Sequence, residues 1–195
     1  MGRTATVSRT TGETDIVIVL DIDGTGKTTI DTGVGFFDHM LTAFGRHSLF
    51  DLEVRCKGDT WVDDHHTVED VGIALGDALR QALGDKRGIR RFSDVAVPLD
   101  EALVMAAVDI SGRGELYWDV PIGPDKVGTF DTELGMEFFV GFARNAGITL
   151  HLRELCGTNA HHILEATFKA CARALRAACE QDPRVDTVPS TKGVL

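Results

Sequence analysis

Two copies of the motif His-His-x-x-Glu are the residues with the clearest capacity for chemistry in this sequence. They lie at His65-His66…Glu69 and at His161-His162…Glu165. Within a helix, residues four apart share a face, so the first histidine and the glutamate of each motif can bind one metal ion together. The second histidine points about 100° away and must serve a different ion. A single motif would be more typical of capping or surface histidines than of a metal site, but its duplication in a matching context favours a metal-binding site.

The spacing predicts that the two motifs exchange ligands between two ions. One ion would be bound by His65, Glu69 and His162, and its twin by His161, Glu165 and His66. Aligning the two halves of the chain places His39 opposite Glu137, and these residues would complete the second and the first ligand set, respectively. Mixed nitrogen and oxygen donors with open positions suit Mn²⁺ and tolerate Fe²⁺, Co²⁺ or Zn²⁺. Asp63 and Asp64, which precede the first motif, could orient the ligands without binding metal.

The elements that must position these residues occur twice along the chain. In the first half, the pattern predicts strands at 14–23, 28–30 and 50–56 and helices at 36–47 and 64–83. In the second half it predicts strands at 102–111, 115–121 and 149–155 and helices at 132–145 and 160–179. We therefore predict an α+β fold of duplicated β-β-α-β-α half-domains, packed as one pseudo-symmetric unit with helices on one face of each sheet. A single domain would span 1–195, with repeats at about 3–90 and 92–182 and a substrate-binding tail at 183–195.

Composition excludes some classes of function. The chain has 195 residues and a formal net charge of −10, which argues against a nucleic-acid-binding protein. A few local arginines and lysines can still bind one phosphate group. The sequence lacks the ~18 consecutive apolar residues of a membrane span and an apolar N-terminal stretch. We therefore expect a cytoplasmic protein without membrane contacts, with its four cysteines as reduced thiols.

Seven segments together closely resemble the imidazoleglycerol-phosphate dehydratase family of histidine biosynthesis. They are TGVGFFDHML, GDTWVDDHHTVEDVGIALG, PLDEAL, VDISGR, GTNAHHILEATFKACARAL and PSTKGVL, with GETDI near the N-terminus. Their order and spacing carry the resemblance, which covers the chain from Arg3 to Leu195. The resemblance implies a lyase that dehydrates D-erythro-imidazole glycerol phosphate to imidazole acetol phosphate. It also implies two Mn²⁺ ions per active site, which stabilise an imidazolate form of the substrate ring, and 24-subunit homo-oligomers with sites at subunit interfaces.

The resemblance also assigns roles to individual positions. Glu13, which would otherwise be interpreted as an exposed acid before a strand, matches a catalytic carboxylate that moves a proton at the substrate side chain. His47 and Lys169 match positions at the catalytic site, and Asp100 matches a supporting position. The phosphate-binding positions are Arg91, Arg113, Ser190, Thr191 and Lys192. The remaining predicted substrate contacts are Glu13, His47 and the metal-ligand candidates His39, His65, His66, Glu69, His161, His162 and Glu165.

Glu137 is the point at which the sequence departs from the family pattern. Many members of the family carry histidine at this position. A carboxylate can replace imidazole as a metal ligand. His151 is an alternative donor, but it aligns with Glu53 of the first half and not with a ligand position.

The two His-His-x-x-Glu motifs by themselves are compatible with two other functions. A metal-dependent hydrolase would have a bridging carboxylate and ions about 3.5–4 Å apart. A non-catalytic metal-storage or structural assembly would leave four residues without a coordinated function: Glu13, Arg91, Arg113 and Lys192.

Overall fold

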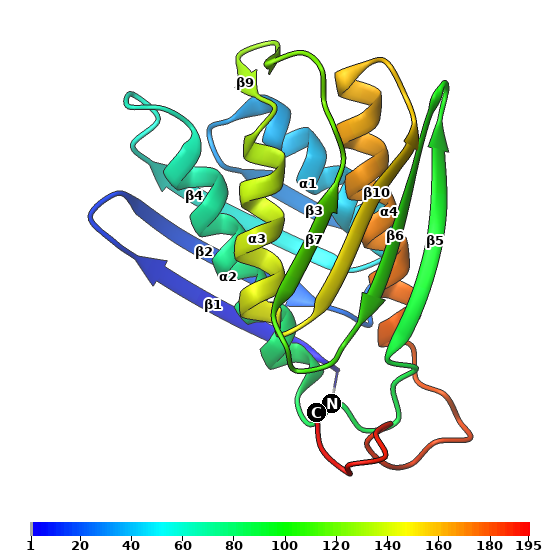
Figure 1. Cartoon of the computed structure of the whole chain (residues 1–195). Helices are drawn as coiled ribbons and strands as arrows, with labels where there is room; N and C mark the ends of the chain where they lie inside the picture. The colour runs from blue at the N-terminus through cyan, green and yellow to red at the C-terminus, as the bar shows by residue number, and fades with distance from the viewer. Residues whose placement is uncertain (1) are drawn as a thin grey trace.

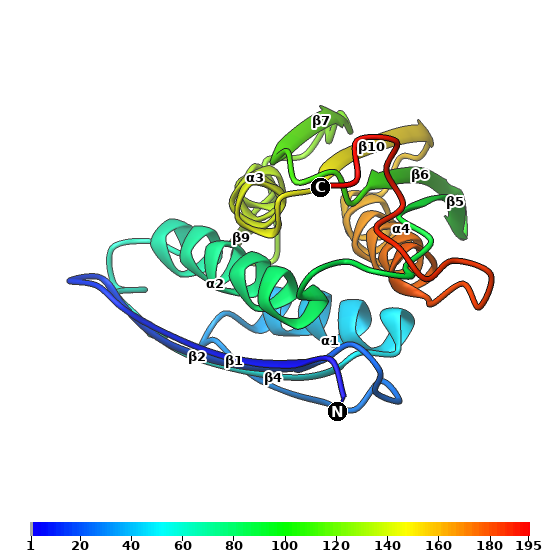
Figure 2. The same cartoon turned by 90° about the horizontal axis from the view of Figure 1, so that it is seen from below.

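Four helices lie between two four-stranded sheets in the computed structural model, which describes residues 2–195 (Figure 1). Seen along the layers, the order is sheet, helix pair, helix pair, sheet (Figure 2). Helices α1 (Gly35–Ser48) and α2 (His65–Leu83) cover the first sheet, and α3 (Leu134–Ala146) and α4 (Ala160–Cys179) cover the second. Within residues 2–195, no helix combines the length and apolarity that a membrane crossing requires.

The two sheets have the same topology. The first has the order β1 (Thr4–Thr10), β2 (Thr14–Asp21), β4 (Asp51–Gly58) and β3 (Thr28–Asp31). The second has the order β5 (Phe92–Leu99), β6 (Ala102–Asp109), β10 (Thr149–Cys156) and β7 (Glu115–Asp119). In each sheet an antiparallel hairpin is followed by one antiparallel and one parallel pairing. A short ribbon of β8 (Lys126–Val127) and β9 (Phe130–Asp131) precedes α3.

The α+β class and the duplicated halves are therefore confirmed, but each half begins with one more strand than predicted. Apart from the short β8–β9 ribbon of the second half, the order in each half is β-β-β-α-β-α, with β1 and β5 as the additional strands. Both are edge strands, which pair on one side only. β1 buries only Ala5 and Val7, and β5 contains Pro98, so neither presents the strong apolar alternation of a central strand.

Local backbone geometry and one side-chain cap fix several of the helix ends. Leu49 follows α1 and Gly147 follows α3, both in the left-handed conformation with φ of 59° and 66°. At the start of α4, the Asn159 side chain accepts hydrogen bonds from the backbone N–H groups of His161 and His162. This cap fixes the first turn of the helix that carries the second His-His-x-x-Glu motif.

Glycines bring α2 and α3 into close backbone contact across the boundary between the halves. A Cβ atom at Gly72 would lie 2.5 Å from the Phe138 carbonyl oxygen, and one at Gly76 would lie 2.5 Å from the Phe142 carbonyl oxygen. Glycine in a helix interior costs about 1 kcal/mol of helix propensity. Its retention here is explained by the close approach of the two helices, which joins both halves in one continuous core.

The Gly76→Ala substitution should destabilise the protein although alanine is the better helix former. The new Cβ would also lie 2.9 Å from the Ala146 backbone nitrogen, so α2 and α3 must separate, at a cost of about 1–3 kcal/mol for overpacking. Chemical denaturation should show a lower midpoint. Gly35→Ala in α1, where a Cβ has nothing within 4 Å, is the matched control and should leave the midpoint unchanged or higher. Equal stability of Gly76→Ala and wild type would contradict the proposed close contact.

Candidate active site

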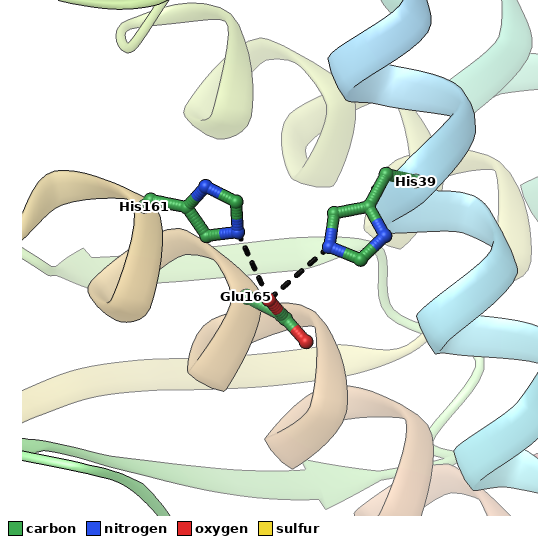
Figure 3. A group of neighbouring side chains, drawn as sticks. All are labelled: His39, His161 and Glu165. Carbon is green, nitrogen blue, oxygen red and sulfur yellow. Dashed lines mark hydrogen bonds and ion pairs between the residues drawn. The ribbon is translucent and has the colours of Figure 1, made fainter.

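His39, His161 and Glu165 form a cluster between α1 and α4 (Figure 3). The Nε2 atoms of His39 and His161 lie 3.2 and 3.1 Å from the same oxygen, Glu165 Oε2. One ligand atom from each residue lies within 4.8 Å of the others. Two imidazole nitrogens and a carboxylate oxygen are a donor set that fits a first-row divalent metal ion such as Mn²⁺. The structure thus brings together three of the four ligands predicted for the second ion.

Lys169 holds the carboxylate of this cluster in its charged form. It lies one helical turn after Glu165, and its Nζ donates to Glu165 Oε1 at 2.6 Å. Burial works to raise the pKa of Glu165, but the hydrogen bonds and charges of Lys169 and His39 lower this pKa to about 2. Glu165 is therefore an anion at neutral pH and needs no deprotonation before it can bind a cation.

The other predicted ligand set is only partly assembled. His65 and Glu69 share one face of α2, with His65 Nε2 3.8 Å from Glu69 Oε2. Within residues 2–195, no third donor joins these two in a metal-sized group. Glu137 lies in the first turn of α3 and lines a pocket with Trp118 and Asp131. The assignment of Glu137, and the sharing of ligands between the motifs, stay predictions.

The second histidine of each motif is held by a carboxylate that sequence reasoning missed. His66 Nδ1 lies 3.0 Å from Asp59 Oδ2, and His162 Nδ1 lies 2.7 Å from Glu101 Oε2. Asp63, in contrast, accepts a hydrogen bond from the backbone N–H of His65 and, within residues 2–195, forms no hydrogen bond or ion pair with an imidazole ring. Asp59 and Glu101 lie 7 and 61 residues from their partners, so helical spacing gives no signal for either contact.

Glu13 lies in the turn between β1 and β2, next to the first motif. Its Oε1 is 3.6 Å from His66 Nε2, and its backbone carbonyl accepts a hydrogen bond from the Asp59 N–H at 3.1 Å. The turn is tied to α2 because Thr14 donates to the buried Asp70 carboxylate, which also accepts from Arg9. The candidate catalytic carboxylate is therefore placed beside a candidate metal ligand.

The other supporting residues lie at varying distances from the cluster. His47, at the end of α1, is near Lys169, and burial together with the Lys169 charge lowers the pKa of His47. Asp100 Oδ2 lies 3.9 Å from His162 Nε2. The alternative donor His151 stacks on Tyr117 in the second sheet, with ring centroids 4.3 Å apart. Within residues 2–195, His151 belongs to no metal-sized group.

The two predicted phosphate-binding arginines both contact Asp109, a residue that the sequence analysis did not single out. Arg91 donates to both oxygens of Asp109 at 2.7 and 3.2 Å, and Arg113 donates to Oδ2 at 3.5 Å. Arg91 also donates to the Pro189 carbonyl at 2.8 Å. This contact brings the C-terminal segment with Ser190, Thr191 and Lys192 alongside the arginines.

The cluster and the arginines lie at opposite ends of α4. His161 is in the first turn of this helix, whereas the Arg91 backbone N–H donates to the carbonyl of Ala178 in the last turn. Figure 1 shows α4 running from the upper edge of the molecule to the C-terminal segment at the lower edge. The helix has 20 residues, so its ends are about 30 Å apart.

The duplicated fold and its histidine–glutamate cluster indicate the class of this protein, an enzyme built on two matching α+β halves with a candidate metal site. The family model described as imidazoleglycerol-phosphate dehydratase matches residues 32–175. A relative with this name from Granulibacter bethesdensis is 61% identical over 196 residues, covering 100% of both chains. Another, from Acidiphilium cryptum, is 60% identical with the same coverage. The chain belongs to the imidazoleglycerol-phosphate dehydratase family, and it is a dehydratase of histidine biosynthesis.

Solved structures support the same assignment. The imidazoleglycerol-phosphate dehydratase of Staphylococcus aureus superposes with a TM-score of 0.84 at 40% identity, covering 92% of this chain and 99% of that one. The enzyme of Pyrococcus furiosus has a TM-score of 0.84 at 41% identity, covering 97% and 100%. The resemblance inferred from the sequence motifs is thereby confirmed.

Proposed function

We propose that this chain dehydrates D-erythro-imidazole glycerol phosphate to imidazole acetol phosphate with two Mn²⁺ ions per active site. The observation that supports this proposal best is the convergence of His39, His161 and Glu165 from two helices. The hydrogen removed in this reaction has no neighbouring carbonyl to acidify it, so the substrate ring must provide the activation. When bound, the two ions would supply Lewis acidity at the ring nitrogens and stabilise the imidazolate form of the ring.

The protein's own residues would divide the remaining tasks. The ligand sets are His39, His161, Glu165 and His66 for one ion and His65, Glu69, His162 and Glu137 for the other. Lys169 keeps Glu165 charged and in place. Glu13, beside His66, would move the proton at the substrate side chain, because a carboxylate placed near the reacting carbon acts as a general base or acid.

Binding of the phosphate is the task of Arg91, Arg113, Ser190, Thr191 and Lys192. Guanidinium groups bind phosphate oxygens in pairs, and a lysine adds a compact charge. Asp109 would hold the two arginines in position before the substrate arrives, since it contacts both of them. The hydrogen bond from Arg91 to Pro189 would fix the tail segment beside them.

The separation along α4 supports an active site that is shared between subunits. Only a three-carbon chain joins the ring and the phosphate of the substrate. Such a molecule cannot reach between metal ligands and arginines at the two ends of a 20-residue helix, about 30 Å apart. The metal ligands of one subunit must then act with the phosphate-binding residues of another, which is consistent with a homo-oligomer, proposed to have 24 subunits. The predicted ligands that do not join their sets within one chain would likewise come from neighbouring copies. They are His66 for the first-named set and His162 and Glu137 for the other.

Removal and return of metal tests the proposed reaction. Protein stripped with a chelator should form no imidazole acetol phosphate, and addition of Mn²⁺ should restore the activity because the ligand groups remain in place. Product formation is followed by chromatography, and the stripped protein without added metal is the control. Absence of product with every divalent metal tested would refute the proposal.

Mixed assemblies test the sharing of sites. His161→Ala and Arg91→Ala proteins should each be inactive, but an equal mixture that is dissociated and reassembled should regain up to roughly a quarter of the wild-type activity. A quarter of the sites would combine an intact metal cluster with an intact Arg91 from another subunit. Each variant reassembled alone is the control. Activity that does not rise above the controls would show that both groups must belong to the same chain.

A further inference from the structure

Asp59 and Glu101 make equivalent contacts in the two halves of the molecule. Each accepts from the Nδ1 atom of the second histidine of a motif, Asp59 from His66 at 3.0 Å and Glu101 from His162 at 2.7 Å. An ionised carboxylate has only acceptors, so the proton in each contact is on the imidazole Nδ1. In the neutral ring this places the lone pair on Nε2, which is then free to bind a metal ion.

We propose that Asp59 and Glu101 are positioning residues that fix His66 and His162 as Nε2 donors to the metal ions. This inference deepens the proposed function, because it assumes that the two histidines are metal ligands. An imidazole without such a partner exchanges between two tautomers and rotates about its side-chain bonds. Binding a metal must then also select one tautomer and one orientation, which weakens the affinity.

The two contacts arise from unrelated places in the repeat. Asp59 follows the end of β4, whereas Glu101 lies in the turn between β5 and β6. A contact inherited from the duplication would come from matching positions. The same hydrogen bond formed from two different elements indicates a requirement of the histidine itself. Within residues 2–195, His65 and His161 have no carboxylate at Nδ1, and their Nε2 atoms face Glu69 and Glu165 instead.

Both carboxylates are themselves held in place. Glu101 Oε1 accepts from the Asn159 N–H at 2.8 Å and the Thr158 N–H at 3.3 Å, which leaves Oε2 for His162. Asp59 is buried, with 7% of its surface exposed, and its backbone N–H donates to Glu13. Asp59 therefore also sets the position of His66 relative to the candidate catalytic carboxylate.

Metal affinity, measured on the stripped full-length protein, tests this role without depending on turnover. Calorimetric titration with Mn²⁺ should show about 10- to 100-fold weaker binding for Asp59→Ala and for Glu101→Ala, the usual loss when an outer partner of a ligand is removed. Asp59→Asn and Glu101→Gln should lose less, because an amide oxygen can still accept the Nδ1 proton. Nitrogen NMR of histidine-labelled, metal-free protein should show less Nδ1–H tautomer in the alanine variants.

Two controls separate ring contacts from contacts with the backbone. Asp63→Ala removes a carboxylate that accepts a hydrogen bond from the His65 backbone N–H, and Asn159→Ala removes the cap of α4. Asp63→Ala should bind Mn²⁺ nearly as wild type does. Asn159→Ala, which loosens the first turn of α4, should melt at a lower temperature and lose less Mn²⁺ affinity than Glu101→Ala. Wild-type affinity in Asp59→Ala and Glu101→Ala, or equal losses in the controls, would overturn this inference and leave the proposed function unaffected. A wild-type protein that binds no Mn²⁺ would refute the proposed function and the inference with it.

Discussion

The Glu165→Gln protein should lose bound metal and should turn over more than about 100-fold more slowly than wild type. Removing an outer partner of a metal ligand typically costs 10- to 100-fold in affinity or activity, and loss of a ligand itself must cost at least as much. Glu165 is the one residue of the cluster that contacts both His39 and His161. Glutamine has the same size but provides no anionic oxygen. The fold should therefore persist while metal binding and turnover are lost.

The side effect of this substitution on Lys169 also has to be measured. Without Glu165 the half-buried Lys169 ammonium loses its ion pair at 2.6 Å, so thermal stability should be recorded together with metal content and kcat. Glu180→Gln, just after the same helix, breaks only the exposed contact with Arg90 and is the matched control. A Glu165→Gln protein with full metal content and normal kcat would show that this cluster is not a ligand set.

The Glu13→Gln protein should retain its metal and its assembly but lose about 10²- to 10⁴-fold in kcat, the usual contribution of a positioned general base or acid. Glu13 Oε1 lies 3.6 Å from His66 Nε2, and its turn is fixed through Asp59 and Thr14. The amide keeps the size of the side chain but cannot take up a proton. KM should change little, since the phosphate-binding residues are untouched.

A matched variant lies two residues further along the chain, at the start of β2. Asp15→Asn removes an exposed carboxylate that contacts Thr10, so its kcat should equal that of wild type. The comparison requires steady-state kinetics and metal analysis of both proteins. Normal turnover of Glu13→Gln would show that another group moves the proton, and loss of metal would show that Glu13 acts as a ligand.

Features encoded within one element could be predicted from the sequence. The bounds of α2 and α4 agree with their apolar periodicity and their terminal residues to within about a residue, and the repeat led to His39 as a partner of the second motif. Helical spacing relates residues on one face of one helix, so it placed Glu165 beside His161 correctly.

Features that depend on the meeting of distant segments could not be predicted. Asp59, Glu101 and Asp109 lie in segments that carry the family resemblance, but no spacing rule points from them to the histidines and arginines that they contact. The edge strands β1 and β5 were missed because a strand paired on one side needs less apolar alternation than a central one. The place of Glu137 depends on groups outside a single chain in the proposed assembly, so the fold of one subunit leaves it a prediction.

The arrangement of the two halves has a consequence for the ancestry of this chain. Each sheet carries its own pair of helices, and those helices bury their other side against the helices of the opposite half, most closely at the glycines of α2. A single half would expose that side to water and could cover it by pairing with an identical copy. The molecule is therefore constructed as a dimer joined into one polypeptide. Once joined, the two copies were free to diverge, and the aligned positions His39 and Glu137, both predicted ligands, are an example of such divergence.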